Sequence, residues 1–437
     1  MKSRRQWVLL LVACMAAVAA PAVAGRRGGP DESADSLARR QVLVMLRLPA
    51  AHYRPDANYG NDYGNPPGRR ARHRVADQLA RAHGLSLHDE WPMQALGLDC
   101  FVFDAPDAAA AAREALALAA DPRVESAQAM QLFHSLATPA PPAHGTRAMS
   151  PPVATGDPLY AAQPAAANWH LAELHAQSTG RGVRIAVIDS GVALDHPDLR
   201  GQVAIARNFV DGAGNVAETH GTAVAGIIAA RAGNGAGIVG IAPQARLLAL
   251  RACWQQGAGP AACSSFTLAR ALQFAIDARA QVLNLSLSGP DDGLLSRLLD
   301  VALQRGISVV GAVDAQARDG GFPASHTGVL AVDGLGRTAA PRTVLHAPGA
   351  GIPAPLPDGG WGLVSGASFA TAQVSGLAAL LLQRRPGLAP SQLLALLEPA
   401  PGLVLAQERP GAIDACAVMQ RSAGHCVCAC AAASAAR

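Results

Sequence analysis

The sequence has little charge and little excess of either sign. Charged residues make up 16% of its 437 residues, the formal net charge is +4, and Lys2 is the one lysine. The basic side chains are scattered, so the chain lacks the concentrated positive charge by which proteins bind nucleic acid. We therefore expect no nucleic-acid partner. Half of the residues are apolar, which is typical of a globular protein, and the length suits two folded units.

Long apolar runs are also scarce, and the one at the N-terminus is short for a membrane span. Residues 7–23 form this run, which follows a basic start and ends near the small residues Ala22 and Ala24. A basic start, an apolar run and a small-residue cleavage site are the parts of a secretory signal peptide. We therefore predict that residues 1–24 are a signal peptide. The mature chain would be secreted or periplasmic, without a transmembrane segment.

One feature of this run favours an alternative. Residues 11–14, L-V-A-C, resemble the processing site of lipoproteins, which would leave the mature chain anchored through a lipid on Cys14. The apolar run continues well past Cys14, which favours removal of the whole segment. Free secretion is therefore the main prediction, and a lipoprotein anchor is the alternative.

If the chain is exported, its cysteines are expected to form disulfides, because disulfides persist outside the cytoplasm. Cys253 and Cys263 flank a short loop that a local disulfide would close. The tail holds a further group, Cys416, Cys426, Cys428 and Cys430. This group lacks the paired C-x-x-C spacing of structural zinc sites, although a metal site is the alternative interpretation. We therefore predict disulfides and assign no metal ligands.

The front segment, residues 40–136, has the pattern of a small α+β domain. Its patterns predict a strand at 42–48, a helix at 72–83, two strands within 86–103, a helix at 108–119 and a strand at 124–133. This is a βαββαβ order. A polar insert rich in Gly, Asn and Pro at 58–70 interrupts it and is predicted to be a loop. The Pro-rich residues 138–157 that follow form a linker open to proteolysis.

Beyond the linker, short β-branched runs alternate with longer runs rich in Ala and Leu. The predicted strands are 183–188, 247–251, 282–286, 307–313 and 329–332, and the predicted helices are 220–230, 266–278, 294–304, 368–384 and 391–397. Alternation of this kind predicts an α/β fold, with a mostly parallel sheet between two layers of helices. Sites in such sheets form at the carboxyl ends of the strands.

Three residues break the surrounding pattern. Asp189 ends an apolar strand before a Ser-Gly turn, His220 begins a helix of small residues, and Ser368 begins a helix after Gly366. Singly, each is ordinary as a turn residue or a helix cap. Together they supply a nucleophile, a base and a carboxylate that orients the base. Amide groups at the start of the Ser368 helix can also stabilise developing negative charge.

The strings around these residues, V-I-D-S-G-V, H-G-T-A-V-A-G and G-A-S-F-A-T, closely resemble the three active-site motifs of the subtilisin-like serine proteases. They occur in that family's order of Asp, His and Ser. Similar strings stand at 196–199 (H-P-D-L), 240–243 (G-I-A-P), 283–289 (L-N-L-S-L-S-G) and 346–349 (H-A-P-G). The resemblance covers 157–415, and it implies a subtilisin-like three-layer catalytic domain at 158–415.

The resemblance implies a secreted serine endopeptidase that works through an acyl-enzyme on Ser368 and needs no cofactor for its chemistry. His220 would act as general base and then acid, and Asp189 would fix the imidazole. Peptide or protein substrates would add an extended strand to an edge of the domain. That edge consists of Leu285, Ser286, Leu287, Ser288 and Gly289.

The resemblance also gives the front segment a role. Residues 25–137 would be a propeptide that assists folding, inhibits the site and is removed autocatalytically, which makes the precursor a zymogen. A permanent domain is the alternative. The linker favours removal, with the cut between Ala137 and Asp157. Residues 416–437 form a tail rich in Cys and Ala.

The sequence departs from the family pattern at the oxyanion hole and at the calcium sites. Asp314 stands where the family has its oxyanion-hole Asn, beside the amide of Ser368 as the other donor, and an ionised carboxylate would repel an oxyanion. Our hypothesis is that Asp314 is protonated and donates, because the strand before it is apolar. The alternative is a catalytically weak or inactive binding protein on the same fold. Similarity to the family's calcium sites is limited to Asp198 and Asn234, so structural calcium stays open.

Overall fold

The structure is a computed structural model that describes residues 33–47, 66–137, 156–255, 257, 259–334, 343–398, 412–425, 427 and 428. The predicted signal peptide with Cys14, residues 138–155 of the linker, and Cys426 and Cys430 lie outside the described residues. None of the helices in these ranges is both long enough and apolar enough to cross a membrane.

The front domain is an antiparallel sheet with two helices on one face. Its strands follow the order β2 (Ser86–Met93), β3 (Leu98–Asp104), β1 (Gln41–Arg47), β4 (Ser126–Ala129). Helices α2 (Pro66–Ala82) and α3 (Ala108–Ala119) complete the expected βαββαβ order, and a short helix, α1 (Ala34–Arg39), precedes it. The prediction of a loop through residue 70 was wrong, because α2 already begins at Pro66. Proline fits there, since the first N–H groups of a helix have no intrahelical partner.

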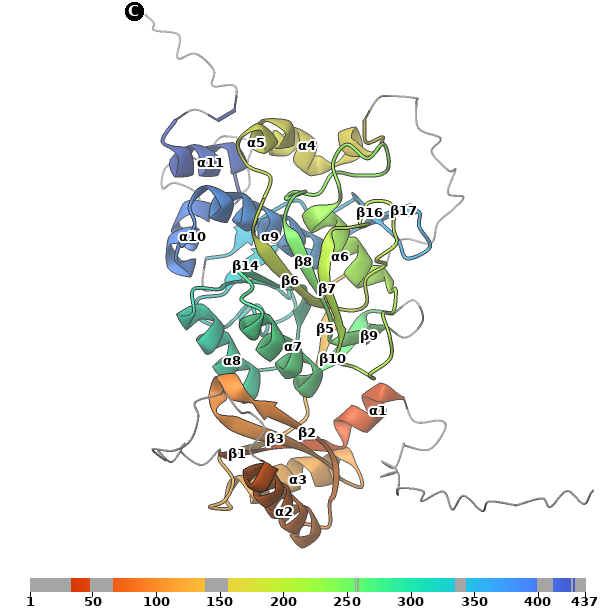
Figure 1. Ribbon diagram of the computed structural model, residues 1–437, viewed down its shortest axis with the longest axis vertical. Helices are drawn as coiled ribbons and strands as arrows, with labels where there is room; N and C mark the ends of the chain where they lie inside the picture. Colours follow the sequence, from red (N-terminus) through yellow and green to blue (C-terminus); the bar gives the residue numbers. More distant parts are fainter. Residues whose placement is uncertain are drawn as a thin grey trace, which may run out of the picture.

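Both faces of this sheet are buried. Val42 and Val44 pack with Phe103 in the core beneath α2 and α3. The alternate residues Leu43 and Met45 face the opposite way and join the core around α7 (Ser265–Asp277) and α8 (Gly293–Gln304) of the next domain. Figure 1 shows this sheet directly beneath α7 and α8. The two domains therefore share one hydrophobic core.

The strand expected at 124–133 is two strands in two sheets. β4 ends at Ala129, and after two residues β5 (Leu132–Ser135) enters a second antiparallel sheet of order β12 (Leu287–Ser288), β5, β10 (Ala261–Ser264), β9 (Cys253–Gln255). The apolar pattern continues across the break because both strands direct apolar side chains into a core, Ala127 and Ala129 from β4 and Phe133 from β5, so the pattern alone does not reveal the change of partner.

The large domain is built on a seven-stranded sheet whose neighbouring strands all run parallel. Its order is β15 (Leu345–His346), β14 (Leu330–Asp333), β13 (Ser308–Ala312), β11 (Val282–Leu285), β6 (Arg184–Asp189), β8 (Arg246–Arg251), β7 (Val203–Asn208). Helices α6 (Thr219–Ala229) and α9 (Ala367–Arg384) cover one face, and α7 and α8 cover the other. The predicted three-layer α/β fold is confirmed.

The central strand β6 illustrates why this layering follows from the sequence. Ile185 and Val187 point into the core with α6 and α9, whereas Ala186 and Ile188 point into the core with α7. A strand buried on both faces needs a continuous apolar run. That run ends abruptly at Asp189, which carries a charge to the carboxyl edge of the sheet.

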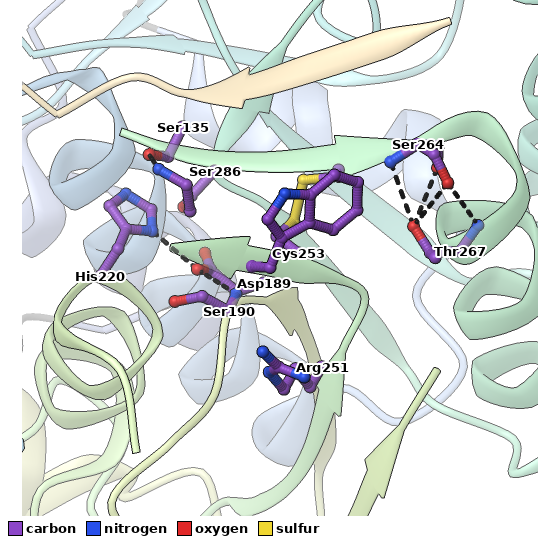
Figure 2. The surroundings of a disulfide bond; sticks show 12 residues. Ser135, Asp189, Ser190, His220, Arg251, Cys253, Ser264, Thr267 and Ser286 are labelled. Carbon is purple, nitrogen blue, oxygen red and sulfur yellow. Dashed lines mark hydrogen bonds and ion pairs between the residues drawn. A yellow bond between two sulfur atoms is a disulfide. The ribbon is translucent and has the colours of Figure 1, made fainter. Parts of the chain in front are cut away.

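The remaining elements lie around these layers. They are η1 (Gln94–Leu96), η2 (Tyr160–Ala162), α4 (Pro164–Asn168), α5 (Leu171–Gln177), β16 (Ile352–Pro355), β17 (Trp361–Val364), α10 (Pro390–Leu397) and α11 (Ala415–Ala423). The expected disulfide between Cys253 and Cys263 is present and joins β9 to β10 (Figure 2). In the tail, Cys416 is bonded to Cys428.

Candidate active site

Three elements bring the sequence-predicted triad to the carboxyl edge of the sheet. Asp189 is the last residue of β6, His220 lies in the first turn of α6, and Ser368 lies in the first turn of α9. After β6 the chain first forms β7 and β8 on one side of this strand and then crosses to form β11, β13, β14 and β15 on the other side. Such a switch point is where ligands bind in open parallel sheets.

Asp189 and His220 form a buried pair. His220 Nδ1 donates to Asp189 Oδ1 at 2.7 Å, and the two residues are 5% and 2% exposed (Figure 2). The proton on Nδ1 leaves the lone pair on Nε2, the atom needed for a general base. That Nε2 is buried and has no hydrogen-bond partner among the described residues.

Ser368 is fully buried beneath the front segment. Its Oγ donates to the carbonyl of Ser286 at 2.9 Å and accepts from the amide of Leu136 at 3.0 Å. Its own amide donates to the carbonyl of Leu136 at 3.4 Å. The backbone of Leu136, which directly follows β5, therefore lies against the candidate nucleophile. The hydroxyl points to Ser286 in this arrangement.

β5 lies between two strands of the large domain as an added strand. It runs antiparallel to both, with Ser135 opposite Leu287 and His134 opposite Ser288 and Ala262. Of the predicted substrate edge, Leu287 and Ser288 form β12, Leu285 ends β11, and Ser286 lies between them. Gly289 forms a bridge to Phe322. β10, the partner on the other side, was missed by sequence reasoning, because its four residues carry no pattern of their own.

The side chain of Phe133 in β5 packs against Gly289 and the ring of Phe322. It is fully buried, and its ring centroid lies 6.1 Å from that of Phe322. An added Cβ on Gly289 would overlap the Phe133 ring. The Phe133 ring therefore fits here because residue 289 is a glycine and has no side chain.

A buried ion pair that sequence reasoning missed supports the Asp189–His220 pair. Arg251, at the end of β8, donates through Nε and Nη2 to the two carboxylate oxygens of Glu218, at 2.9 and 3.1 Å. Glu218 also accepts from the amides of Gly191 at 2.5 Å and Gln255 at 3.0 Å. It thus joins the turn after Asp189 to the start of the His220 helix. The available signal was an arginine at the carboxyl end of an otherwise apolar strand.

Burial alone would raise the pKa of Glu218. The hydrogen bonds from Arg251 and from the Gly191 and Gln255 amides outweigh that effect, so the pKa of Glu218 lies below its usual range. Glu218 is therefore a carboxylate at neutral pH, and its charge balances that of Arg251.

Asp314 lies just beyond β13 and is half-buried. Its Oδ1 accepts from the Gln316 amide at 2.9 Å, and its own amide donates to the Gly320 carbonyl. These bonds close the turn that Asp314 begins. Its role as an oxyanion donor stays a prediction.

An Asp–His pair and a buried Ser at the carboxyl edge of the same parallel sheet define a candidate serine-hydrolase site, although Ser368 Oγ is hydrogen-bonded to Ser286 and not to His220 in this structure. Comparison with known proteins is consistent with this class: residues 180–401, about half of the chain, match the model of the Subtilase family. The chain belongs to the subtilase family.

Curated relatives share the same region. Subtilisin E of Bacillus subtilis (strain 168) is 35% identical over 231 residues, which cover 49% of this chain and 59% of subtilisin E. The thermophilic serine proteinase of Bacillus sp. (strain AK1) is 38% identical over 213 residues, which cover 46% and 52% of the two chains. The chain thus spans less than two thirds of the length of either relative.

Among solved structures, the crystal structure of fervidolysin from Fervidobacterium pennivorans, a keratinolytic enzyme related to subtilisin, matches with a TM-score of 0.61. The match covers 89% of this chain and 62% of fervidolysin at 22% identity. At that identity the likeness shows the fold, and it extends beyond the region of the family match.

Proposed function

We propose that this chain is a secreted serine endopeptidase made as a zymogen. In the proposed reaction His220 Nε2 takes the hydroxyl proton while Ser368 Oγ attacks the carbonyl carbon of the peptide bond. The carbon–nitrogen bond then breaks, and His220 returns that proton to the leaving amine. Water then attacks the ester carbon while His220 takes its proton, the bond from that carbon to Ser368 Oγ breaks, and His220 returns the proton to Oγ. Asp189 holds the ring with Nε2 free for both transfers.

The observation that carries this proposal is the position of β5. A segment of the chain itself lies as an extended strand against β12 and β10 and ends with the Leu136 carbonyl next to the Ser368 amide. Strand addition of this kind is how extended peptides bind to sheet edges. It supports a site for peptide substrates, and it supports the front domain as an inhibitory propeptide that occupies the site.

The contacts of Leu136 also support a particular processing site. Its carbonyl accepts from Ser368, the amide that would stabilise an oxyanion there. Gly366, at a φ of 143°, allows this close approach, because an added Cβ would overlap the Leu136 carbonyl oxygen. We therefore assign the activation cut to the Leu136–Ala137 bond. This is one bond before the range that the Pro-rich linker favours.

Labelling with a serine-directed phosphonate tests the function directly. Wild type should react and hydrolyse an unfolded protein substrate, Ser368→Ala should do neither, and Ser391→Ala on the exposed start of α10 should match wild type. If wild type neither reacts nor hydrolyses, the inactive binding protein suggested by Asp314 is the better account. Detergent partitioning of wild type and Cys14→Ala separates free secretion from a lipid anchor.

A further inference from the structure

Asp198 is a fully buried carboxylate outside the triad, in the turn that follows β6. It is one of the two positions at which the sequence is similar to the family's calcium sites. Calcium takes six to eight oxygen ligands, with carboxylate lone pairs directed at the ion. Whether the ion fits here therefore depends on what the oxygens of Asp198 already contact.

Both carboxylate oxygens of Asp198 accept hydrogen bonds from nitrogen. Oδ2 accepts from Trp361 Nε1 at 2.6 Å and from the Ile238 amide at 3.1 Å. Oδ1 accepts from Asn234 Nδ2 at 3.2 Å. The positive ends of these N–H groups lie where a cation would have to lie, and they would repel it.

The indole of Trp361 fills the space next to Asp198. Gly237, at a φ of 49°, passes so close that an added Cβ would overlap both Trp361 Nε1 and Asp198 Oδ2. On another side, the His196 ring meets the Trp361 ring edge-on with centroids 5.0 Å apart, and His196 Nε2 donates to the Gly360 carbonyl. The tryptophan is therefore packed into place rather than lying loosely on the surface.

Asp157 is a second carboxylate close to Asn234, in the loop at 231–240, and it also accepts hydrogen bonds from nitrogen. Asp157 accepts from the amides of Gly233 at 2.7 Å and Asn234 at 3.1 Å, and Asn234 Oδ1 accepts from the Ala236 amide at 2.8 Å. Within the described ranges, no three His, Cys, Asp or Glu side chains gather as a metal site. These oxygens serve to close the 231–240 loop, so the residues present do not fit calcium.

We propose that the hydrogen bond from Trp361 to Asp198 takes the place of a calcium ion and ties the 231–240 loop to the β16–β17 hairpin without metal. The hairpin also packs on α6, where Gly226 leaves room for the ring of Pro355. The tie thereby supports the helix that carries His220. The inference concerns folding stability and does not depend on the proposed peptidase activity.

Thermal unfolding of the full chain with Ser368→Ala, which cannot cut itself by the proposed route, tests this inference. Its Tm should be the same in excess EDTA and in millimolar calcium. Adding Trp361→Phe keeps an aromatic ring but removes the N–H, and it should lower Tm by about 2–6 °C in both buffers. Trp91→Phe is the matched control, because Trp91 Nε1 has no hydrogen-bond partner among the described residues, and it should change Tm much less.

Three results would overturn the inference. One is a Tm that EDTA lowers and calcium restores, and another is a Trp361→Phe variant as stable as its parent. If Trp361→Phe does not fold, calorimetric titration of calcium into the EDTA-treated Ser368→Ala chain decides the question. We expect no saturable binding that depends on Asp198. One equivalent of calcium that is lost with Asp198→Asn would contradict the tie.

Discussion

Glu218 supports the geometry of the Asp189–His220 pair, because it joins the turn after Asp189 to the start of the His220 helix. Glu218→Gln keeps the size of the side chain but removes the buried carboxylate on Arg251, whose charge would keep only the half-exposed Asp211 as a partner. We expect a loss of about 3 kcal/mol in the free energy of unfolding, measured by denaturant titration in the Ser368→Ala background. Arg251 also pairs with Asp211, and the Asp211 side chain is 50% exposed. Asp211→Asn should therefore cost less than about 1 kcal/mol in the free energy of unfolding. Equal losses for the two variants would contradict this role.

The lowered pKa of Glu218 also gives a pH dependence. A carboxyl group whose pKa is lower in the folded than in the unfolded chain stabilises the fold above its unfolded value, near 4.5. That contribution is lost as the pH falls through the folded pKa. Stability of the Ser368→Ala chain should therefore decline below pH 4.5 more steeply than that of the same chain with Glu218→Gln. Parallel stability curves for the two chains would show that Glu218 makes no such contribution.

The hypothesis that Asp314 donates to the oxyanion predicts a pH dependence of catalysis. If a protonated Asp314 donates to the oxyanion, kcat/KM of wild type should fall at high pH, whereas Asp314→Asn should remain active. The difference at high pH should reach about 100-fold, the effect of one oxyanion donor. Superimposable pH profiles of kcat/KM for the two enzymes would end the hypothesis.

At the residue scale, the sequence predicts what short motifs encode. Asp189, His220 and Ser368 each stand in a string that marks them, and the structure brings Asp189 and His220 into contact. Glu218 and Arg251 could not be paired in advance, because their contact depends on where β8 ends relative to α6. Trp361 is 163 positions from Asp198, and no periodicity links the two.

At the scale of elements, the proposed function depends on how β5 and its Phe133 side chain pack against the large domain. Phe133→Ala removes a fully buried ring from between Gly289 and Phe322. Loss of a buried Phe costs about 3–5 kcal/mol, so β5 should lie in the site less often. We expect self-processing of the full chain to slow by at least tenfold in a time course. His134→Ala, on the same strand with a half-buried side chain, should process nearly as wild type. Equal rates for Phe133→Ala and wild type would place the cut elsewhere.

The elements also show where sequence patterns stop being informative. Buried strands such as β6 and amphipathic helices such as α8 are predicted within a residue or two, because a continuous apolar run specifies the strand and an apolar periodicity specifies the helix. β7, β9, β10 and β15 were missed, since each is short or lies at a sheet edge and gains its conformation from pairing. The division of 124–133 into β4 and β5 depends on two different partner sheets, which a single segment cannot indicate.

At the scale of the whole molecule, the front domain contributes one face of its sheet to the core of the large domain. Arg270 of α7 lies at this interface with its guanidinium 4.4 Å from the ring centroid of Trp91. Trp91→Ala should weaken docking by about 0.5–2 kcal/mol and lower the yield of processed enzyme. The specific activity of the processed fraction should not change, because Trp91 would leave with the propeptide. A changed specific activity would show that the front domain stays.

The most direct test of the account is the N-terminal sequence of the large fragment that wild type produces when expressed beside Ser368→Ala. We predict that the fragment begins at Ala137 and that Ser368→Ala stays whole. A fragment that begins within 138–157 would show that Leu136 is not the residue presented to Ser368. A wild-type chain that stays whole, or a Ser368→Ala chain cut at the same bond, would contradict the claim that this site cleaves peptide bonds.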